Sequence, residues 1–346
     1  MELTSRRHTV ADYAGAMELC YTNGWTDGFP VVPATEERIV GMLAAAGLEP
    51  QLQLAFIENR QVSVTAEKVA INAVMAGCKP EYMPVIVAAV EALADPLYAY
   101  HGPATSTGGS AVFMVVNGPI ARELDVNCGD NLFGPGWRAN ATLGRAVRLI
   151  MRNVIGTLPG ELDRSSLGHA GKYTFCIAEN ETDSPWPAFH TTRGFRPDQD
   201  AVTVFAALAP HQFTNQLSAH PEGILKTACA YMKISAGAGR RPQYAMVFAG
   251  EHQQTFKKAG WSREQVQQYV FENAKSSVAE LKRNFMIAGD LKPEDENAMS
   301  PIIETPQDLL VLAAGGRVGV QSAFIPGWGA KTGSQSVTRE IRRIQH

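Results

Sequence analysis

Short apolar runs alternate along this chain with segments whose apolar residues recur at helical spacing. The apolar runs end in glycine or in polar residues, and they cover residues 111–119, 173–181, 202–208, 244–252 and 308–316. Runs of this length, bounded by turn residues, are typical of buried strands. Because the strands alternate with helices, we expect an α/β fold with mainly parallel sheets flanked by helices.

Helical periodicity follows the turn Gly134-Pro135-Gly136, which can continue neither a helix nor a strand. Apolar residues then recur from Ala139 to Val154, which predicts a helix with Asn140 as a candidate N-cap. Earlier helices are expected over residues 9–23, after the N-caps Thr35 and Thr65, and from Pro80.

Two parts of the chain resemble each other. Residues 111–127 match 244–262 as strand, glycine turn and helix, and the strand at 173–181 matches the strand at 308–316. The same order at a nearly constant offset predicts two similar α/β lobes related by a pseudo-two-fold axis. We therefore divide the chain into an N-terminal helical or cap segment (1–95), a first lobe (96–200) and a second lobe (201–346).

Composition narrows the class of protein. The chain has 346 residues, is 45% hydrophobic and carries a net charge of −3. It lacks a long basic run for nucleic acid and an apolar run of the ~18 residues that a membrane span needs. No export signal is recognised at the start. The five cysteines are scattered without C-x-x-C spacing, so neither a disulfide framework nor a zinc ribbon is expected, and we expect a cytoplasmic protein.

Candidate catalytic residues lie mainly after strands, because α/β sheets bind ligands beyond the carboxyl ends of their parallel strands. Glu179 and Glu181 are two residues apart and in extended chain face the same way, so they could act as an acid and a base. The alternative is that one of them caps a helix and the other is solvated. His101, beside Gly102-Pro103 in a glycine-rich loop, is a further candidate acid or base.

Cys128 is the candidate nucleophile or redox residue. It lies near an inferred helix start and two arginines, which are conditions that lower the pKa of a thiol. The alternative that Cys128 merely packs stays open.

Candidate anion-binding residues surround the helix that follows Gly134-Pro135-Gly136. Free N–H groups at a helix start favour an anion, and Arg138 and Arg145 lie beside them. Arg138, Arg145 and Arg152 also share one helix face, so a solvated basic face is the alternative. Further candidate substrate contacts are Asp27, Asn117, Asn140, Lys172, Tyr173, Asn180, Gly316 and Ser322. Structural alternatives are an Asx turn for Asp27 and a role within a strand for Lys172 and Tyr173.

Metal binding is an open alternative. His211 and His220, with a carboxylate such as Glu179, would suit a divalent metal. Neither H-E-x-x-H nor H-x-H spacing is present, so no cofactor is predicted.

Several motifs resemble a family of poorly characterised bacterial proteins associated with UGSC-type (seleno)proteins. They are D-G-x-P-V-x-P (27–33), NGPIAREL (117–124), GPGWRANATLGRA (134–146) and SAFIPGW (322–328). The chain has Cys128-Gly129-Asp130 and no U-G-S-C or C-G-S-C motif, so a redox centre on that motif does not carry over. The resemblance implies a thiol or selenol partner protein.

These observations predict an enzyme, or the large subunit of one, that acts on a small carboxylate- or phosphate-bearing substrate in a cleft between two lobes. Acid–base chemistry by Glu179, Glu181 and His101 would make it a lyase, hydratase or hydrolase. One alternative is a thiol or selenol redox component that uses Cys128 with a partner protein. Another is a non-catalytic scaffold or anion-binding subunit. We expect an oligomer, and neither a nucleic acid nor a membrane as partner.

Overall fold

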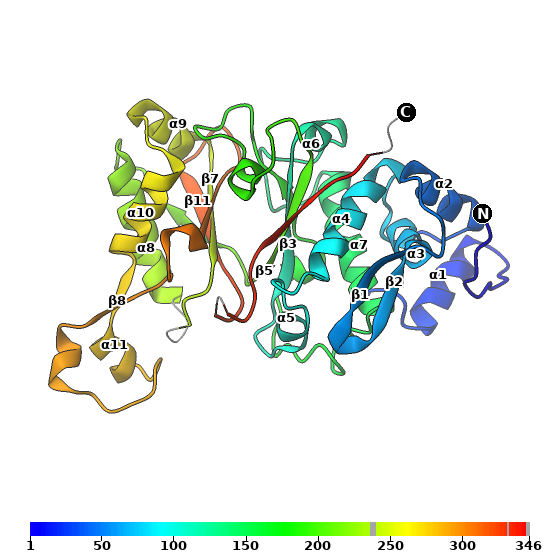
Figure 1. Ribbon diagram of the computed structural model, residues 1–346, viewed down its shortest axis with the longest axis horizontal. Helices are drawn as coiled ribbons and strands as arrows, with labels where there is room; N and C mark the ends of the chain where they lie inside the picture. The colour runs from blue at the N-terminus through cyan, green and yellow to red at the C-terminus, as the bar shows by residue number, and fades with distance from the viewer. Residues whose placement is uncertain (236–239, 331, 344–346) are drawn as a thin grey trace.

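Four layers make up the molecule, with two β-sheets face to face and helices on the outer face of each (Figure 1). The computed structural model describes residues 1–235, 240–330 and 332–343. The predicted α/β class is confirmed.

The two central sheets share one pattern of strand pairing. The first has the order β12 (Val337–Glu340), β5 (Ala201–Ala207), β3 (Ala111–Asn117) and β4 (Cys176–Ala178). The second has the order β6 (His211–Thr214), β11 (Gln321–Pro326), β7 (Tyr244–Phe248) and β10 (Leu309–Ala313). In each, the last pair is parallel and the other two pairs are antiparallel.

The expectation of mainly parallel sheets is therefore wrong. It rested on the long apolar runs, which do form β3, β5, β7 and β10. The antiparallel strands β6 and β12 carry polar sequences, HQFT and VTRE, and so give no apolar run. Their place in the sheets depends on pairing with β11 and β5, which a local hydrophobic pattern does not reveal.

Alternation of side chains along the strands explains why the sheets face each other. Phe113 and Val115 of β3 lie in the same buried cluster as Val247 of β7 and Leu310 of β10, between the sheets. Met114, one position along, points to the opposite face and belongs to the cluster under the outer helices. Both faces of these strands are thus buried, as their continuous apolar sequences require.

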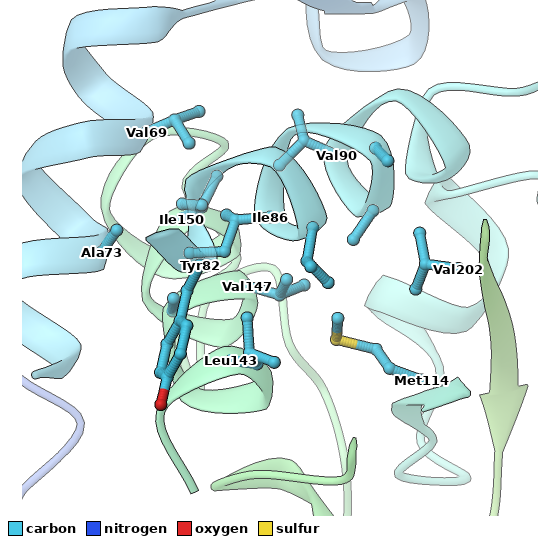
Figure 2. Packing of buried hydrophobic residues seen from close by; sticks show 14 of the residues in the cluster. Val69, Ala73, Tyr82, Ile86, Val90, Met114, Leu143, Val147, Ile150 and Val202 are labelled. Carbon is cyan, nitrogen blue, oxygen red and sulfur yellow. The ribbon is translucent and has the colours of Figure 1, made fainter. Parts of the chain in front are cut away.

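The outer face of the first sheet is covered by α3 (Ala66–Ala76), α4 (Met83–Leu93) and α7 (Arg138–Asn153). Ile86 of α4 and Val147 of α7 lie in one apolar cluster with Met114 of β3 (Figure 2). Residues before 96 thus contribute to the main core. β5 and β12, which the sequence division assigns to the second lobe, lie in the first sheet.

The outer face of the second sheet is covered by α8 (Pro221–Ser235), α9 (Gly250–Ala259) and α10 (Arg263–Asn273) (Figure 1). Leu225 of α8, Phe256 of α9 and Val270 of α10 are each fully buried against strand residues such as Met246. This layer is the counterpart of the helices over the first sheet.

Shorter elements surround this framework. The helices are α1 (Tyr13–Thr22), α2 (Glu36–Ala45), α5 (His101–Thr105), α6 (Pro119–Glu123) and α11 (Val278–Arg283). The strands are β1 (Gln53–Ile57) paired with β2 (Val62–Thr65), and β8 (Lys275–Ser277) paired with β9 (Met299–Pro301). The 3-10 turns are η1 (Glu58–Arg60), η2 (Pro80–Tyr82), η3 (Ala170–Lys172), η4 (Phe189–Arg193), η5 (Pro293–Glu296) and η6 (Pro306–Asp308).

Predicted helix starts can be compared with the structure. Thr35 caps α2 through its hydroxyl, which accepts a hydrogen bond from the Arg38 amide. Asn140 is not a cap, because α7 begins at Arg138 and Trp137 occupies the N-cap position without a side-chain cap. The Asn140 amide is instead committed to tertiary hydrogen bonds. Within the described residues, no helix is long and apolar enough to cross a bilayer.

Candidate functional site

β4 runs parallel to β3 in the first sheet, and β10 runs parallel to β7 in the second. The carboxyl ends of β4 and β10 meet at one edge of the molecule. The Asn180 amide donates to the Ala313 carbonyl oxygen at 2.7 Å, and the Gly315 amide donates to the Cys128 carbonyl oxygen at 2.8 Å. These two hydrogen bonds connect the turns at Cys128, Asn180 and Gly315, which are far apart in the sequence. This edge carries Cys128, Glu179 and Glu181, which are three of the four predicted catalytic residues.

Glu179 lies at the centre of this edge, and its side chain is fully buried. Its carboxylate accepts hydrogen bonds from Asn117 Nδ2 (2.7 Å), the Phe189 amide (2.5 Å) and Arg263 Nη2 (3.1 Å). Burial raises the pKa of Glu179, while the Arg263 charge and the hydrogen bonds oppose that shift. Only hydrogen-bond donors contact the Glu179 oxygens, and such contacts favour the charged form of Glu179. Because Glu179 is buried, it is better suited to holding neighbouring side chains in position than to contacting a substrate.

Glu181 is the accessible member of the carboxylate pair, with a side chain that is 24% exposed. Its Oε1 accepts hydrogen bonds from Asn117 Nδ2 at 2.9 Å and from the Gly118 amide at 2.8 Å. Gly118 has φ +90°, and a Cβ there would lie 2.4 Å from the Gln199 carbonyl oxygen, so this donor position requires glycine. One amide group, Asn117 Nδ2, therefore bridges both predicted carboxylates.

His190 adds a residue that the sequence did not suggest. It is completely buried, and its Nδ1 lies 3.9 Å from Glu181 Oε1. Nε2 lies 2.9 Å from the Arg196 carbonyl oxygen, which can only accept, so Nε2 carries a proton. His190 Nδ1 and Asn117 Oδ1 have no hydrogen-bond partner in the part of the chain that the structure describes. Buried polar atoms without partners are rare and mark positions where a ligand or proton can be accommodated.

Cys128 lies near these carboxylates and is half-buried. Burial raises the pKa of its thiol, and the negative charges of Asp183, Glu181 and Glu179 raise it further. The expectation of a lowered thiol pKa is therefore wrong, because the thiol is partly buried and its charged neighbours are carboxylates rather than arginines. At neutral pH the thiol form is favoured, which suits a proton donor better than a nucleophile.

His101 does not join this group. It is exposed at the start of α5, which precedes β3, whereas Asn117 and Glu181 lie beyond the carboxyl end of that strand. In Figure 1, α5 and α6 lie at opposite ends of β3.

The predicted anion-binding arginines contact the N-terminal part of the chain. Arg138 donates through Nε and Nη2 to the Gly77 carbonyl oxygen. Arg145 forms two hydrogen bonds of 2.8 Å to Asp27, and Arg152 donates to the Gly24 carbonyl oxygen. Burial acts to raise the pKa of Asp27, but Arg145 outweighs it and the pKa lies below its ordinary value. This face of α7 binds backbone and a carboxylate of the protein itself.

Asn140 fastens the loop before α7. Its Oδ1 accepts from the Asn127 amide at 2.7 Å, and its Nδ2 donates to the carbonyl oxygens of Asn127 (3.1 Å) and Cys176 (3.0 Å). Since Asn140 is 7% exposed, its contribution is to position the segment that carries Cys128.

Lys172 and Tyr173 lie before β4, at the opposite end of the strand from Glu179. Lys172 Nζ lies 2.8 Å from Asp163 and 2.6 Å from Ser165 Oγ, and Arg148 also contacts Asp163. Burial lowers the pKa of Lys172, and the hydrogen bond to Asp163 opposes that shift. These contacts hold the loop that carries Asp163 and Ser165. The Tyr173 ring packs edge-on against Phe29 with centroids 4.9 Å apart. No motif in the sequence marks Asp163.

The remaining predicted contacts are distributed over the strand-end turns. Asn180 Oδ1 accepts from the Asp183 amide at 3.2 Å, which closes an Asx turn. Gly316 lies against Asp130, because a Cβ on it would lie 2.1 Å from Asp130 Oδ1. Ser322 is buried within β11, opposite Phe248 at the end of β7, and its Oγ lies 2.7 Å from His252 Nδ1.

The possible metal ligands His211 and His220 are both exposed. The His211 ring stacks on Phe324 with centroids 5.0 Å apart, and His220 precedes α8. Among the described residues, no group of three or more His, Cys, Asp or Glu side chains is placed to hold a metal ion.

Comparison with known proteins finds neither a protein family that matches this chain nor a curated protein with significant similarity to it. The resemblance to UGSC-associated proteins therefore stays a prediction.

Proposed function

We propose that the protein is an enzyme that performs acid–base chemistry on a small anionic substrate at the edge formed by Cys128, Glu179 and Glu181. The observation that carries the proposal is the setting of Glu181. The partly exposed Glu181 carboxylate is held by Asn117 and Gly118 and lies 3.9 Å from His190 Nδ1, a buried nitrogen without a hydrogen bond among the described residues. A carboxylate held in this way can accept a proton from a substrate while keeping its orientation.

The two carboxylates and the thiol take different roles. Glu179, paired with Arg263, fixes Asn117 and thereby Glu181. Glu181 accepts the proton of the substrate, and Cys128, held as a neutral thiol by its carboxylate neighbours, returns a proton to the developing anion or leaving group. This division suits elimination, hydration or hydrolysis, as expected for a lyase, hydratase or hydrolase.

An anionic substrate needs a cation, and Arg317 is better placed than Arg138 or Arg145. Its side chain is 84% exposed and its Nη2 lies 3.0 Å from Asp183, a residue of the same edge. Arg138 and Arg145 already contact backbone carbonyl oxygens and Asp27. The substrate carboxylate or phosphate would take the place of Asp183 beside Arg317.

The proposal is tested by proton exchange, which does not require the substrate to be known in advance. Purified protein is incubated in D2O with a panel of small carboxylates and phosphate esters, and proton NMR follows deuterium incorporation or conversion. Glu181→Gln should lower the rate on any active compound by roughly 100-fold or more. Glu272→Gln, the same chemical change on an exposed face of α10, should leave it unchanged. Equal rates for the two variants would exclude Glu181 as the base.

The redox alternative requires a reactive thiolate at Cys128. Its raised pKa favours the acid–base proposal. A thiol or selenol partner protein, implied by the resemblance, would be detected by co-purification with neighbour-encoded proteins and by activity that appears only in the mixture.

We also propose that the two halves are an internal repeat. The shared order of one parallel and two antiparallel pairs supports it. The fourth strands are exchanged, since β6 follows β5 along the chain but pairs with β11, and β12 follows β11 but pairs with β5. Superposition of β3, β4 and β5 on β7, β10 and β11 should give a common backbone path.

A further inference from the structure

An open groove of about 860 Å³ lies between the segment that follows Glu181 and the start of α10. Its lining includes Trp186, Phe189, Lys257, Trp261, Arg263 and Gln267. Glu181 does not line the groove, whereas Arg263, which does, contacts Glu179. Its volume is within the range of small-molecule sites.

Positive charge predominates in the lining. Its charged residues are Arg193, Lys257, Arg263 and Glu264. Glu179 neutralises the charge of Arg263. The positive charges of Arg193 and Lys257 then exceed the one negative charge of Glu264. The Lys257 side chain has no ion pair or hydrogen bond within the described part of the chain, and Lys257 is exposed. An anion would therefore be attracted to this groove, with Lys257 free to contact it.

Trp186, Phe189 and Arg263 are buried in the wall of the groove, beside the half-buried Trp261. The Arg263 guanidinium lies 5.9 Å from the Trp186 ring centre and 5.8 Å from that of Phe189, and Arg263 Nε donates to the Val311 carbonyl oxygen. Trp186 Nε1 donates to the Trp261 carbonyl oxygen at 2.9 Å, which fixes the two tryptophans relative to each other. Trp261 is half-buried and so has ring surface available. Indole planes stack on planar ligands.

We propose that this groove binds a small planar aromatic anion of the aryl carboxylate class. The aromatic ring lies against Trp261, and the carboxylate contacts Lys257. This site is independent of the acid–base function proposed for Glu181, because neither its charge nor its aromatic surface involves that residue.

The test uses indole-3-carboxylate as the probe and isothermal titration calorimetry of the full-length protein. Indole-3-carboxamide keeps the ring and lacks the charge, and cyclohexanecarboxylate keeps the charge and lacks the flat ring. Each should bind at least about tenfold more weakly than indole-3-carboxylate, because each loses one of the two interactions.

Two neighbouring lysines of α9 give matched variants. Lys257→Gln removes the cation of the groove and should weaken indole-3-carboxylate binding at least about fivefold. Lys258→Gln makes the same change at an exposed residue outside the lining and should bind like the wild type. Both positions are on the surface, so both variants are expected to fold.

Glu181→Gln should also bind like the wild type, and this separates a failure here from a failure of the acid–base proposal. Absence of a binding signal for indole-3-carboxylate with the wild type would overturn the inference. So would equal affinity of the Lys257→Gln and Lys258→Gln variants, or equal affinity for the carboxylate and the carboxamide.

Discussion

Arg263 Nη2 lies 3.1 Å from Glu179 Oε1, and the two side chains are 3% and 0% exposed. The residues are far apart in the sequence, and they join the end of β4 in the first sheet to the start of α10 over the second. Their ion pair therefore holds the two halves of the molecule together beside the proposed site. Breaking this ion pair should therefore lower the stability of the protein.

Arg263→Met should lower the free energy of unfolding by about 3–5 kcal/mol, because it leaves the Glu179 carboxylate buried without its cation. Urea denaturation measures the change. Arg283→Met is the control, since Arg283 and Glu296 form an ion pair whose side chains are 49% and 48% exposed. Its loss should cost less than about 1 kcal/mol. Similar losses for the two variants would show that the buried ion pair contributes no more to stability than the exposed ion pair.

Two helix glycines should respond oppositely to alanine. In α7, a Cβ at Gly144 would lie 2.5 Å from Thr174 Oγ1 and 2.7 Å from the Phe175 amide, so Gly144→Ala should destabilise the protein by roughly 1–3 kcal/mol. In α2, a Cβ at Gly41 meets nothing within 4 Å, so Gly41→Ala should stabilise it by roughly 0.5–1 kcal/mol. Thermal denaturation of both variants is the measurement. Stabilisation by Gly144→Ala would contradict the close packing of α7 on this segment.

The Cys128 thiol should react slowly with iodoacetamide at neutral pH. Burial and the neighbouring carboxylates raise its pKa, so the midpoint of labelling should lie above the value of about 8.5 for a free thiol. Glu181→Gln removes one of these negative charges and should move the midpoint down. Mass spectrometry of Cys128 peptides over a pH series follows both effects. A midpoint below that of a free thiol would instead favour the redox hypothesis.

Glu67 should make stability depend on acid pH. This carboxylate is 1% exposed and accepts hydrogen bonds from Thr4, Ser5 and Gln51. Burial acts to raise its pKa, but these bonds outweigh burial and lower the pKa from 4.5 to about 2. A lowered pKa stabilises the folded state fully above about pH 5, and the stabilisation is lost as the pH falls towards 2.

Glu67→Gln should therefore be about 2–3 kcal/mol less stable than the wild type at pH 7, and the difference should shrink towards pH 2. Urea midpoints at a series of pH values measure it. Glu161→Gln, at an exposed carboxylate, should show little difference at any pH. A constant gap for Glu67→Gln across this range would show that the carboxylate charge is not responsible.

Local sequence patterns were sufficient for much of the framework. The apolar runs correspond to β3, β5, β7 and β10, and the helix after Gly134-Pro135-Gly136 is α7. These elements are buried on at least one face, so their hydrophobic period is imposed by the core and can be recognised without knowing the fold. Thr35 likewise caps α2 through a contact three residues away, which is a local interaction.

The candidate site was predictable only in part. Glu179, Glu181 and Cys128 lie at turns after strands or before a helix, and such positions can be inferred from the order of elements. His190 and Arg263 could not be inferred, because their contacts with Glu181 and Glu179 depend on how η4 and α10 pack against the strand ends. His101 was grouped with the carboxylates although it lies at the other end of β3, since a loop sequence does not tell which end of a sheet it reaches.

The sequence by itself determined the buried strands β3, β5, β7 and β10 and the helix α7, because burial imposes a hydrophobic pattern on each of them. Tertiary structure decided the direction of pairing, the positions of β6 in the second sheet and β12 in the first, and the contacts of the α7 arginines. Those features depend on hydrogen bonds and charges between residues distant in the chain. The same long-range contacts bury Cys128 and place carboxylates around it, and both effects raise the pKa that its local sequence suggested would be low.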